Sequence, residues 1–84
     1  MDKLKYIIDE IGQFMIFSPT VQHVHAGHLL MGMFGPDIVS AGFVDFFDGK
    51  VYCHGESISL GLKSLGEVDS AIIADKLNLA VGVN

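Results

Sequence analysis

Three histidines lie close together in the first third of the chain. His23, His25 and His28 have the spacing H-x-H-x-x-H. Neutral imidazole is the commonest metal ligand in proteins, and a catalytic zinc ion often takes three of them. A helix would place His25 beside His28, whereas a strand would place His23 and His25 on one face, so a site of all three needs a loop. The cluster is the candidate metal site, with zinc or another transition metal as its cofactor.

Two other interpretations of these histidines stay open. The simpler one is that they are polar residues that solvate a loop or an interface. The other is a pH-responsive interface, since unperturbed histidine titrates near pH 6.5. Three later residues would add metal ligands if their segment passes near the cluster, namely Cys53, His54 and Glu56.

A serine in the second half of the chain is the candidate nucleophile. Ser57 follows Gly55-Glu56, but the G-x-S-x-G nucleophile motif requires glycine at the position of Ser59. Ser57 would also need a histidine base, and His54 is the last histidine of the chain. Serines that alternate with Ile58 and Leu60 are explained more simply as one face of a strand. We therefore expect no catalytic residue, and the chain reads as a non-enzymatic protein.

Composition limits the classes of function. The chain has 84 residues, which we interpret as one domain over residues 1–84, with a formal net charge of −5. Five scattered lysines and no arginine argue against nucleic-acid binding. Charge-free stretches are too short and too interrupted for a membrane span. We expect no signal peptide, and the single cysteine suits the cytoplasm.

The chain is unusually apolar for its size. Hydrophobic residues make up 50% and charged residues 18%, against about 25% charged residues in a typical soluble domain. A small domain leaves much of its surface exposed, so this apolar surplus favours contact with another copy. We therefore expect a homo-oligomer, with a dimer as the first hypothesis.

A hairpin is the element around which the fold is expected to form. Asp48-Gly49 separates two apolar runs within residues 38–62, which predicts an antiparallel hairpin with a type I′ turn. Apolar residues occur at both odd and even positions of residues 38–47, so this strand should be covered on both faces. The return strand changes parity, and Gly55-Glu56 is the predicted bulge or bend. That break would turn Ile58, Leu60 and Leu62 to the face of Val51 and Cys53.

Helices are expected on both sides of the hairpin. Residues 2–11 carry an apolar stripe at helical spacing, although Phe14–Phe17 could be a strand. Residues 64–77 begin with Ser64-Leu65-Gly66-Glu67, which matches a capping box. A short helix over residues 19–31 follows Ser18-Pro19, and residues 79–84 would add an edge strand or pack on a neighbour. The predicted fold class is α+β.

A longer pattern gives a resemblance. Residues 40–64, SAGFVDFFDGKVYCHGESISLGLKS, are followed by Asp69, Ile72 and Ile73. This block resembles that of small proteins of proteobacteria and their prophages, which have no assigned activity. The resemblance implies a phage or mobile-element origin and no particular chemistry. The leading hypothesis is a self-associating module that binds another protein, and the alternative is a small metal-binding protein or metalloenzyme that uses the histidine cluster.

Overall fold

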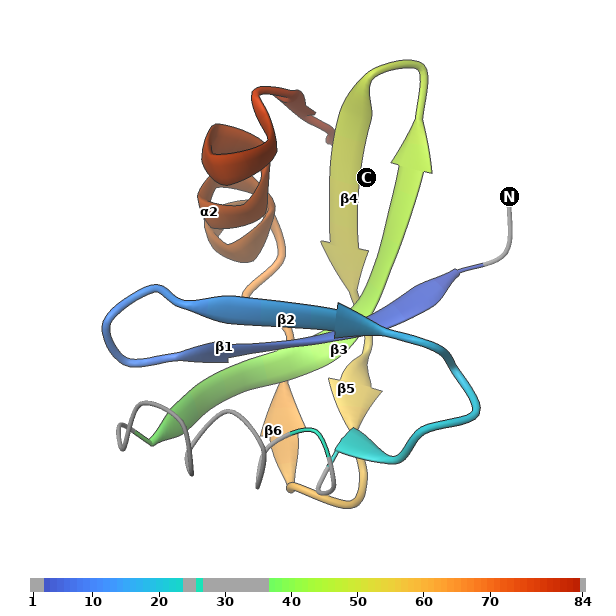
Figure 1. Ribbon diagram of the computed structural model, residues 1–84, viewed down its shortest axis with the longest axis vertical. Helices are drawn as coiled ribbons and strands as arrows, with labels where there is room; N and C mark the ends of the chain where they lie inside the picture. Colours follow the sequence, from blue (N-terminus) through green and yellow to red (C-terminus); the bar gives the residue numbers. More distant parts are fainter. Residues whose placement is uncertain (1–2, 24–25, 27–36, 84) are drawn as a thin grey trace.

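A twisted sheet of five strands forms the centre of the computed structural model, which describes residues 3–23, 26 and 37–83 (Figure 1). The strand order is β2-β1-β3-β4-β7. All neighbouring strands are antiparallel except β4 and β7, which are parallel. The sheet is therefore mixed, and the expectation of a purely antiparallel sheet is wrong. The bounds are β1 (Leu4–Asp9), β2 (Phe14–Phe17), β3 (Ile38–Phe47), β4 (Lys50–His54) and β7 (Ala80–Val81).

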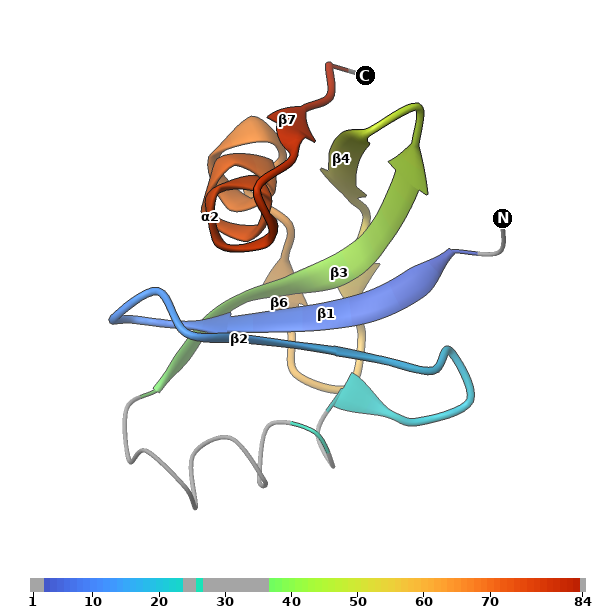
Figure 2. The ribbon, with the colours of Figure 1, turned by 45° about the horizontal axis from the view of Figure 1, so that its top comes forward.

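Two further elements complete the described fold. A small second sheet pairs β5 (Glu56–Ser57) with β6 (Leu62–Lys63). The helix α2 (Glu67–Leu77) lies on one face of the main sheet, against β4 and β7. Figure 2 shows β5 and β6 extending from β3 on the side away from α2. The α+β class and the C-terminal helix are confirmed.

The predicted hairpin is confirmed. Phe47 pairs with Lys50, so the turn contains only Asp48 and Gly49. Their φ angles are 54° and 73°, and two positive φ values are the mark of a type I′ turn. This turn matches the twist of the strands that it joins.

The expected N-terminal helix over residues 2–11 is wrong, since Leu4–Asp9 forms β1. Tyr6-Ile7-Ile8 is an aromatic and β-branched run, and such residues favour strands. β1 is paired on both sides and covered on both faces, so consecutive apolar residues are buried. Ile11, the last member of the supposed helical stripe, is 65% exposed in the turn that leads to β2. The alternative that Phe14–Phe17 is a strand is confirmed.

The second predicted helix, over residues 19–31, falls mainly outside the described residues. Near its predicted start, Ser18 O accepts a hydrogen bond from Val21 N at 3.0 Å. Ala26 N donates to Gln22 O at 3.3 Å, as in a helical turn.

The return strand breaks at the predicted place. β4 ends at His54, and Gly55 has a φ of 79°, which glycine adopts without strain. The predicted consequence of the break is wrong, because Ile58 lies in a turn and is 90% exposed. Leu60 and Leu62 pack on the opposite side of the sheet from Val51 and Cys53. The chain makes a second short hairpin here and does not continue as one strand.

The capping box predicted at Ser64 is also absent. α2 begins at Glu67 with Gly66 as its N-cap, and no side chain caps the helix. Ser64 Oγ instead lies 2.6 Å from the Tyr6 hydroxyl. The helix ends as expected, with Asn78 in the left-handed conformation and Lys76 in the last turn. The predicted edge strand of the tail is confirmed as β7.

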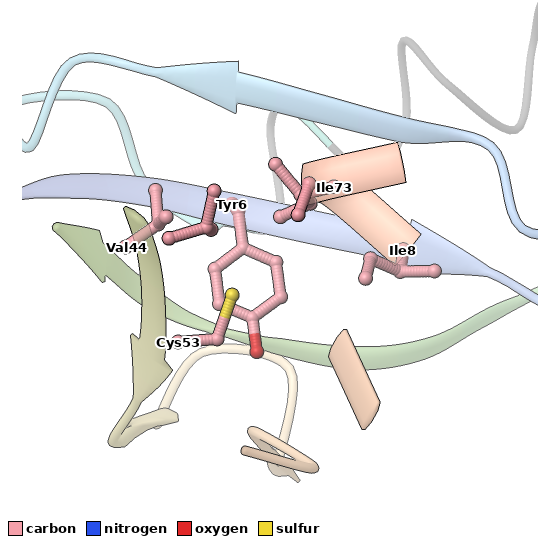
Figure 3. Packing of buried hydrophobic residues seen from close by; sticks show 7 residues of the cluster. Tyr6, Ile8, Val44, Cys53 and Ile73 are labelled. Carbon is pink, nitrogen blue, oxygen red and sulfur yellow. The ribbon is translucent and has the colours of Figure 1, made fainter. Parts of the chain in front are cut away.

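Apolar side chains form two cores, one on each face of the sheet. The larger lies between the sheet and α2 and is shown in part in Figure 3. The smaller lies on the other face of β1 and β3, around Ile7, Ala26 and Ala41. β3 is thus covered on both faces near its middle, as predicted, but Phe47 at its end is 72% exposed. In the described part of the chain, no helix has the length and apolar character needed to cross a membrane.

Candidate functional site

One buried carboxyl group joins three parts of the chain. Asp69, on α2, is 1% exposed. Its Oδ2 accepts hydrogen bonds from the Tyr6 hydroxyl at 2.5 Å and from Leu65 N at 2.9 Å. Its Oδ1 accepts one from the Ser40 hydroxyl at 3.0 Å. The start of α2 is therefore fixed to β1 and β3 by polar contacts as well as by the apolar core.

This network is structural. Tyr6 and Ser40 are fully buried, so no substrate reaches them. Burial, and then the hydrogen bond to Asp69, raise the pKa of Tyr6 well above its ordinary value. The phenol therefore stays protonated and remains a donor to Asp69. Sequence reasoning missed the network because its members come from positions 6, 40 and 69, with no spacing that relates them.

The histidine cluster is only partly described. His25 and His28 lie outside the described residues. His23 is 4% exposed, and its Nε2 lies 2.8 Å from Gly42 O. A carbonyl oxygen only accepts, so Nε2 carries the proton and Nδ1 is the nitrogen left to bind a metal. The site at His23, His25 and His28 stays a prediction, which elemental analysis of untagged protein beside a His25→Ala/His28→Ala variant would test.

The residues suggested as further ligands are separated by the sheet. Cys53 is buried on the α2 side, whereas His54 points to the other face and its Nε2 lies 2.8 Å from Asp45 Oδ2. Glu56 is exposed on β5. Burial is the main cause that raises the pKa of the Cys53 thiol to about 11. Among the described residues, no three histidine, cysteine or acidic side chains come together as a metal site.

Ser57 is placed for a structural role. It is 2% exposed, and its Oγ accepts a hydrogen bond from Leu60 N at 3.2 Å. Ser59 Oγ lies 3.3 Å away. These contacts close the turn between β5 and β6.

A pocket opens beside the second core. It has a volume of about 580 Å³, within the usual range of small-molecule sites. Its wall includes the ring of Phe43, which contacts His23 edge-on at a centroid distance of 5.9 Å. The His54 ring stacks on Phe43 at 6.2 Å. The described residues that line it are Lys5, Gln22, His23, Phe43, Gly55, Glu56, Ile58 and Ser59.

A second surface lies on the same side of the sheet, on the β3–β4 hairpin. Strand alternation and the register place six side chains of this hairpin opposite the α2 face. One of them, Phe43, lines the pocket, and we call the other five the hairpin face: Asp45, Phe47, Lys50, Tyr52 and His54. All five are at least partly exposed. The reverse side of the same strands is covered by α2, so the hairpin has one covered face and one accessible face (Figure 1).

Comparison with known proteins gives no relative. No family model, no curated protein and no solved structure matches this chain. The hairpin face and the pocket are the two candidate functional surfaces of the described chain.

We expect His23 to make the protein less stable in mild acid. Burial, and then the nearby Lys5 charge, lower the pKa of His23, which outweighs the opposing hydrogen bond to Gly42. The unfolded chain then binds more protons than the folded chain as pH falls through about 6.5. Each pH unit of further acidification therefore lowers the free energy of unfolding by up to about 1.4 kcal/mol through His23.

A His23→Gln variant tests this expectation, because glutamine keeps an N–H for Gly42 O and does not titrate. Urea unfolding midpoints at mildly acidic and neutral pH should differ less in the variant than in the parent. Equal pH dependence in the two proteins would contradict it. The other histidines are the same in both, so their contributions cancel.

Proposed function

We propose that this protein is a non-enzymatic module that self-associates through its hairpin face. The observation that carries the proposal is Phe47, a large aromatic side chain that is 72% exposed at the tip of the β3–β4 hairpin. Exposed apolar residues are common singly, but this one lies across from Lys50 and on the same face as Tyr52. Phenylalanine and tyrosine are enriched at the centres of protein interfaces.

A second copy fits the chemistry of the face. In a twofold dimer the same patch meets itself, so each charge must find its complement within the patch. The hairpin face carries both signs, with Lys50 at the tip and Asp45 on the neighbouring rung. Asp45 contacts His54 of its own copy but its side chain is still 39% exposed. Lys50 of one copy can therefore pair with Asp45 of the other, which offsets the repulsion between two chains of net charge −5.

The strand β7 extends this surface. Ala80 N and Gly82 N donate to Gly49 O and Val51 O, so β7 bonds to β4 on one side. It is an outer strand of the sheet, and its other edge is not covered by a strand of the described chain. Val81 and Val83 are 40% and 71% exposed there, in a segment without charge from 79 to 83. These two valines add exposed apolar surface beside the hairpin face.

The area required is modest. A stable dimer buries about 800 Å² on each partner, which is about a sixth of the accessible surface of 4887 Å². The hairpin face and the adjoining β7 edge are continuous through the β4–β7 pairing, so one interface can use both.

We expect Phe47→Glu to convert the protein from dimer to monomer. The substitution puts a charge at the centre of the proposed interface, where burying it without a partner is costly. Size-exclusion chromatography with light scattering at micromolar concentration gives the mass directly. The matched control is Ile11→Glu, at an apolar position that is 65% exposed in the β1–β2 turn, and it should leave the dimer intact.

Two results would contradict the proposal. One is a parent protein that is a monomer at micromolar concentration. The other is equal loss of the dimer in Phe47→Glu and in Ile11→Glu, which would show a general effect of added negative charge and not an interface at the hairpin face.

A further inference from the structure

The pocket beside Phe43 contains an ammonium group that has no carboxylate partner among the described residues. Lys5 lies on β1, directly across from Phe43, and is half-buried. Its Nζ donates one hydrogen bond, to Val21 O at 2.9 Å. Among the described residues, His54 and Asp45 have their charged atoms within 4 Å of each other, whereas Lys5 forms no ion pair. An ammonium has three donors, and this one is in an exposed contact with Val21 O, so its other donors can bind an anion.

The remainder of the pocket suits an apolar group. The Phe43 ring is held between His23 and His54 and has Lys3 Nζ at 5.4 Å from its centroid. Gly55 allows this packing, since a Cβ there would lie 2.9 Å from the Phe43 ring. Ile58 adds an aliphatic side chain from the β5–β6 turn. The wall is therefore formed before any ligand arrives, which lowers the entropic cost of binding.

We propose that the pocket binds a small carboxylic acid with an aromatic or branched apolar body, with the carboxylate at Lys5 and the body against Phe43 and Ile58. An apolar wall with one charged group that fixes orientation is the usual design of a small-molecule site. Glu56 also borders the pocket, but it is exposed, so water screens its repulsion of a carboxylate that is in direct contact with Lys5.

The inference is independent of self-association. The pocket is lined by residues of β1, of β3 at Phe43, of β5 and the turn after it, and of the segment at Gln22-His23, and none of its lining residues belongs to the hairpin face. A monomeric protein could still bind the ligand, and a dimer could lack the site.

Phenylacetate is the probe, with phenethylamine as the matched control of opposite charge. We expect titration with phenylacetate to shift the amide resonances of Lys5, Phe43 and Gly55 in ¹H–¹⁵N spectra of the whole protein. Phenethylamine, at the same concentrations, should give smaller shifts at these positions. Equal shifts with both compounds, or none with phenylacetate, would overturn the proposal.

Two kinds of variant locate the carboxylate. Lys5→Met keeps the aliphatic stem and removes the charge, and it should weaken phenylacetate binding about tenfold or more, as expected for loss of a charge-assisted hydrogen bond. Ile58 is 90% exposed, so substitutions there leave folding unchanged. Both Ile58→Lys and Ile58→Glu lose the aliphatic contact with the ligand body, so they are compared with each other. Ile58→Lys should bind phenylacetate at least about threefold more tightly than Ile58→Glu, the size expected for an exposed charge pair.

The Ile58 pair keeps the test decisive if Lys5→Met does not fold. Affinities that are equal in Ile58→Lys and Ile58→Glu would show that the probe binds elsewhere. A Lys5→Met protein that is folded, by the dispersion of its amide spectrum, and binds phenylacetate as the parent does would also overturn the proposal.

Discussion

Replacing Asp69 with alanine is expected to lower the free energy of unfolding by about 3 kcal/mol, since up to three buried donors lose their acceptor and each costs about 1–3 kcal/mol. The donors are the hydroxyls of Tyr6 and Ser40 and the amide of Leu65. Tyr6 and Ser40 are 0% exposed, so water does not replace the lost carboxyl group. For a domain whose whole stability is about 5–15 kcal/mol, this is a severe effect.

Urea unfolding followed by circular dichroism measures this difference. Asp75→Ala is the matched control, because Asp75 lies on the same helix and is exposed, and it should change the stability by less than about 0.5 kcal/mol. The loss of stability in Tyr6→Phe should lie between those of Asp69→Ala and Asp75→Ala, because this change removes one donor and leaves the other two in place. All proteins must be compared at one concentration, since the stability of a dimer depends on it. An Asp69→Ala midpoint equal to that of Asp75→Ala would contradict the structural role of the network.

Replacing Gly42 with alanine is the second change with a large expected effect. Gly42 lies where the chain leaving β4 crosses β3. A Cβ at this position would be 2.5 Å from His54 O and 3.1 Å from Ser64 Cβ. The first of these atoms is backbone, which cannot rotate away, so β3 and the start of β5 must separate. Overpacking of this kind costs about 1–3 kcal/mol and occasionally more.

Gly49→Asn is the control for Gly42→Ala. Gly49 has a positive φ of 73°, and a Cβ there meets nothing within 4 Å. Asparagine tolerates this conformation better than other non-glycine residues do, so the variant should lose less thermal stability than Gly42→Ala. A Gly42→Ala protein that melts at the temperature of the parent would show that the crossing is looser than described.

The sequence predicts those parts of the fold that depend on local turn chemistry. Asp48-Gly49 specifies the hairpin because both residues adopt a positive φ easily, and Gly55 marks the strand break for the same reason. The C-terminal helix is predicted from its acidic start and from Asn78 at its end. In each case the signal lies within a few residues of the feature.

The errors arise where distant contacts decide the structure. Tyr6-Ile7-Ile8 fits a helical stripe as well as a strand, and only burial on both faces by α2 and by the second core selects the strand. Ser64 fits a capping box, but its hydroxyl forms a hydrogen bond with the Tyr6 hydroxyl instead. Ile58 was expected in a strand face and is exposed, because the chain turns at once after Ser57.

The candidate site was predicted less well than the fold. The excess of apolar residues indicated an association surface, but only the register shows that Phe47 and Tyr52 share a face. Lys5 and Phe43 are 38 positions apart in the sequence and meet because β1 pairs with β3. The histidine spacing predicted a metal site, and of the three residues the described structure places only His23, between two phenylalanine rings.

The central claim is that two copies meet at the hairpin face. The most direct measurement is an isotope-filtered nuclear Overhauser experiment on a mixture of ¹³C-labelled and unlabelled protein, which detects contacts between copies only. The claim predicts intermolecular contacts from the rings of Phe47 and Tyr52. Intermolecular contacts confined to another surface, such as the β1–β2 turn at Ile11, would contradict it.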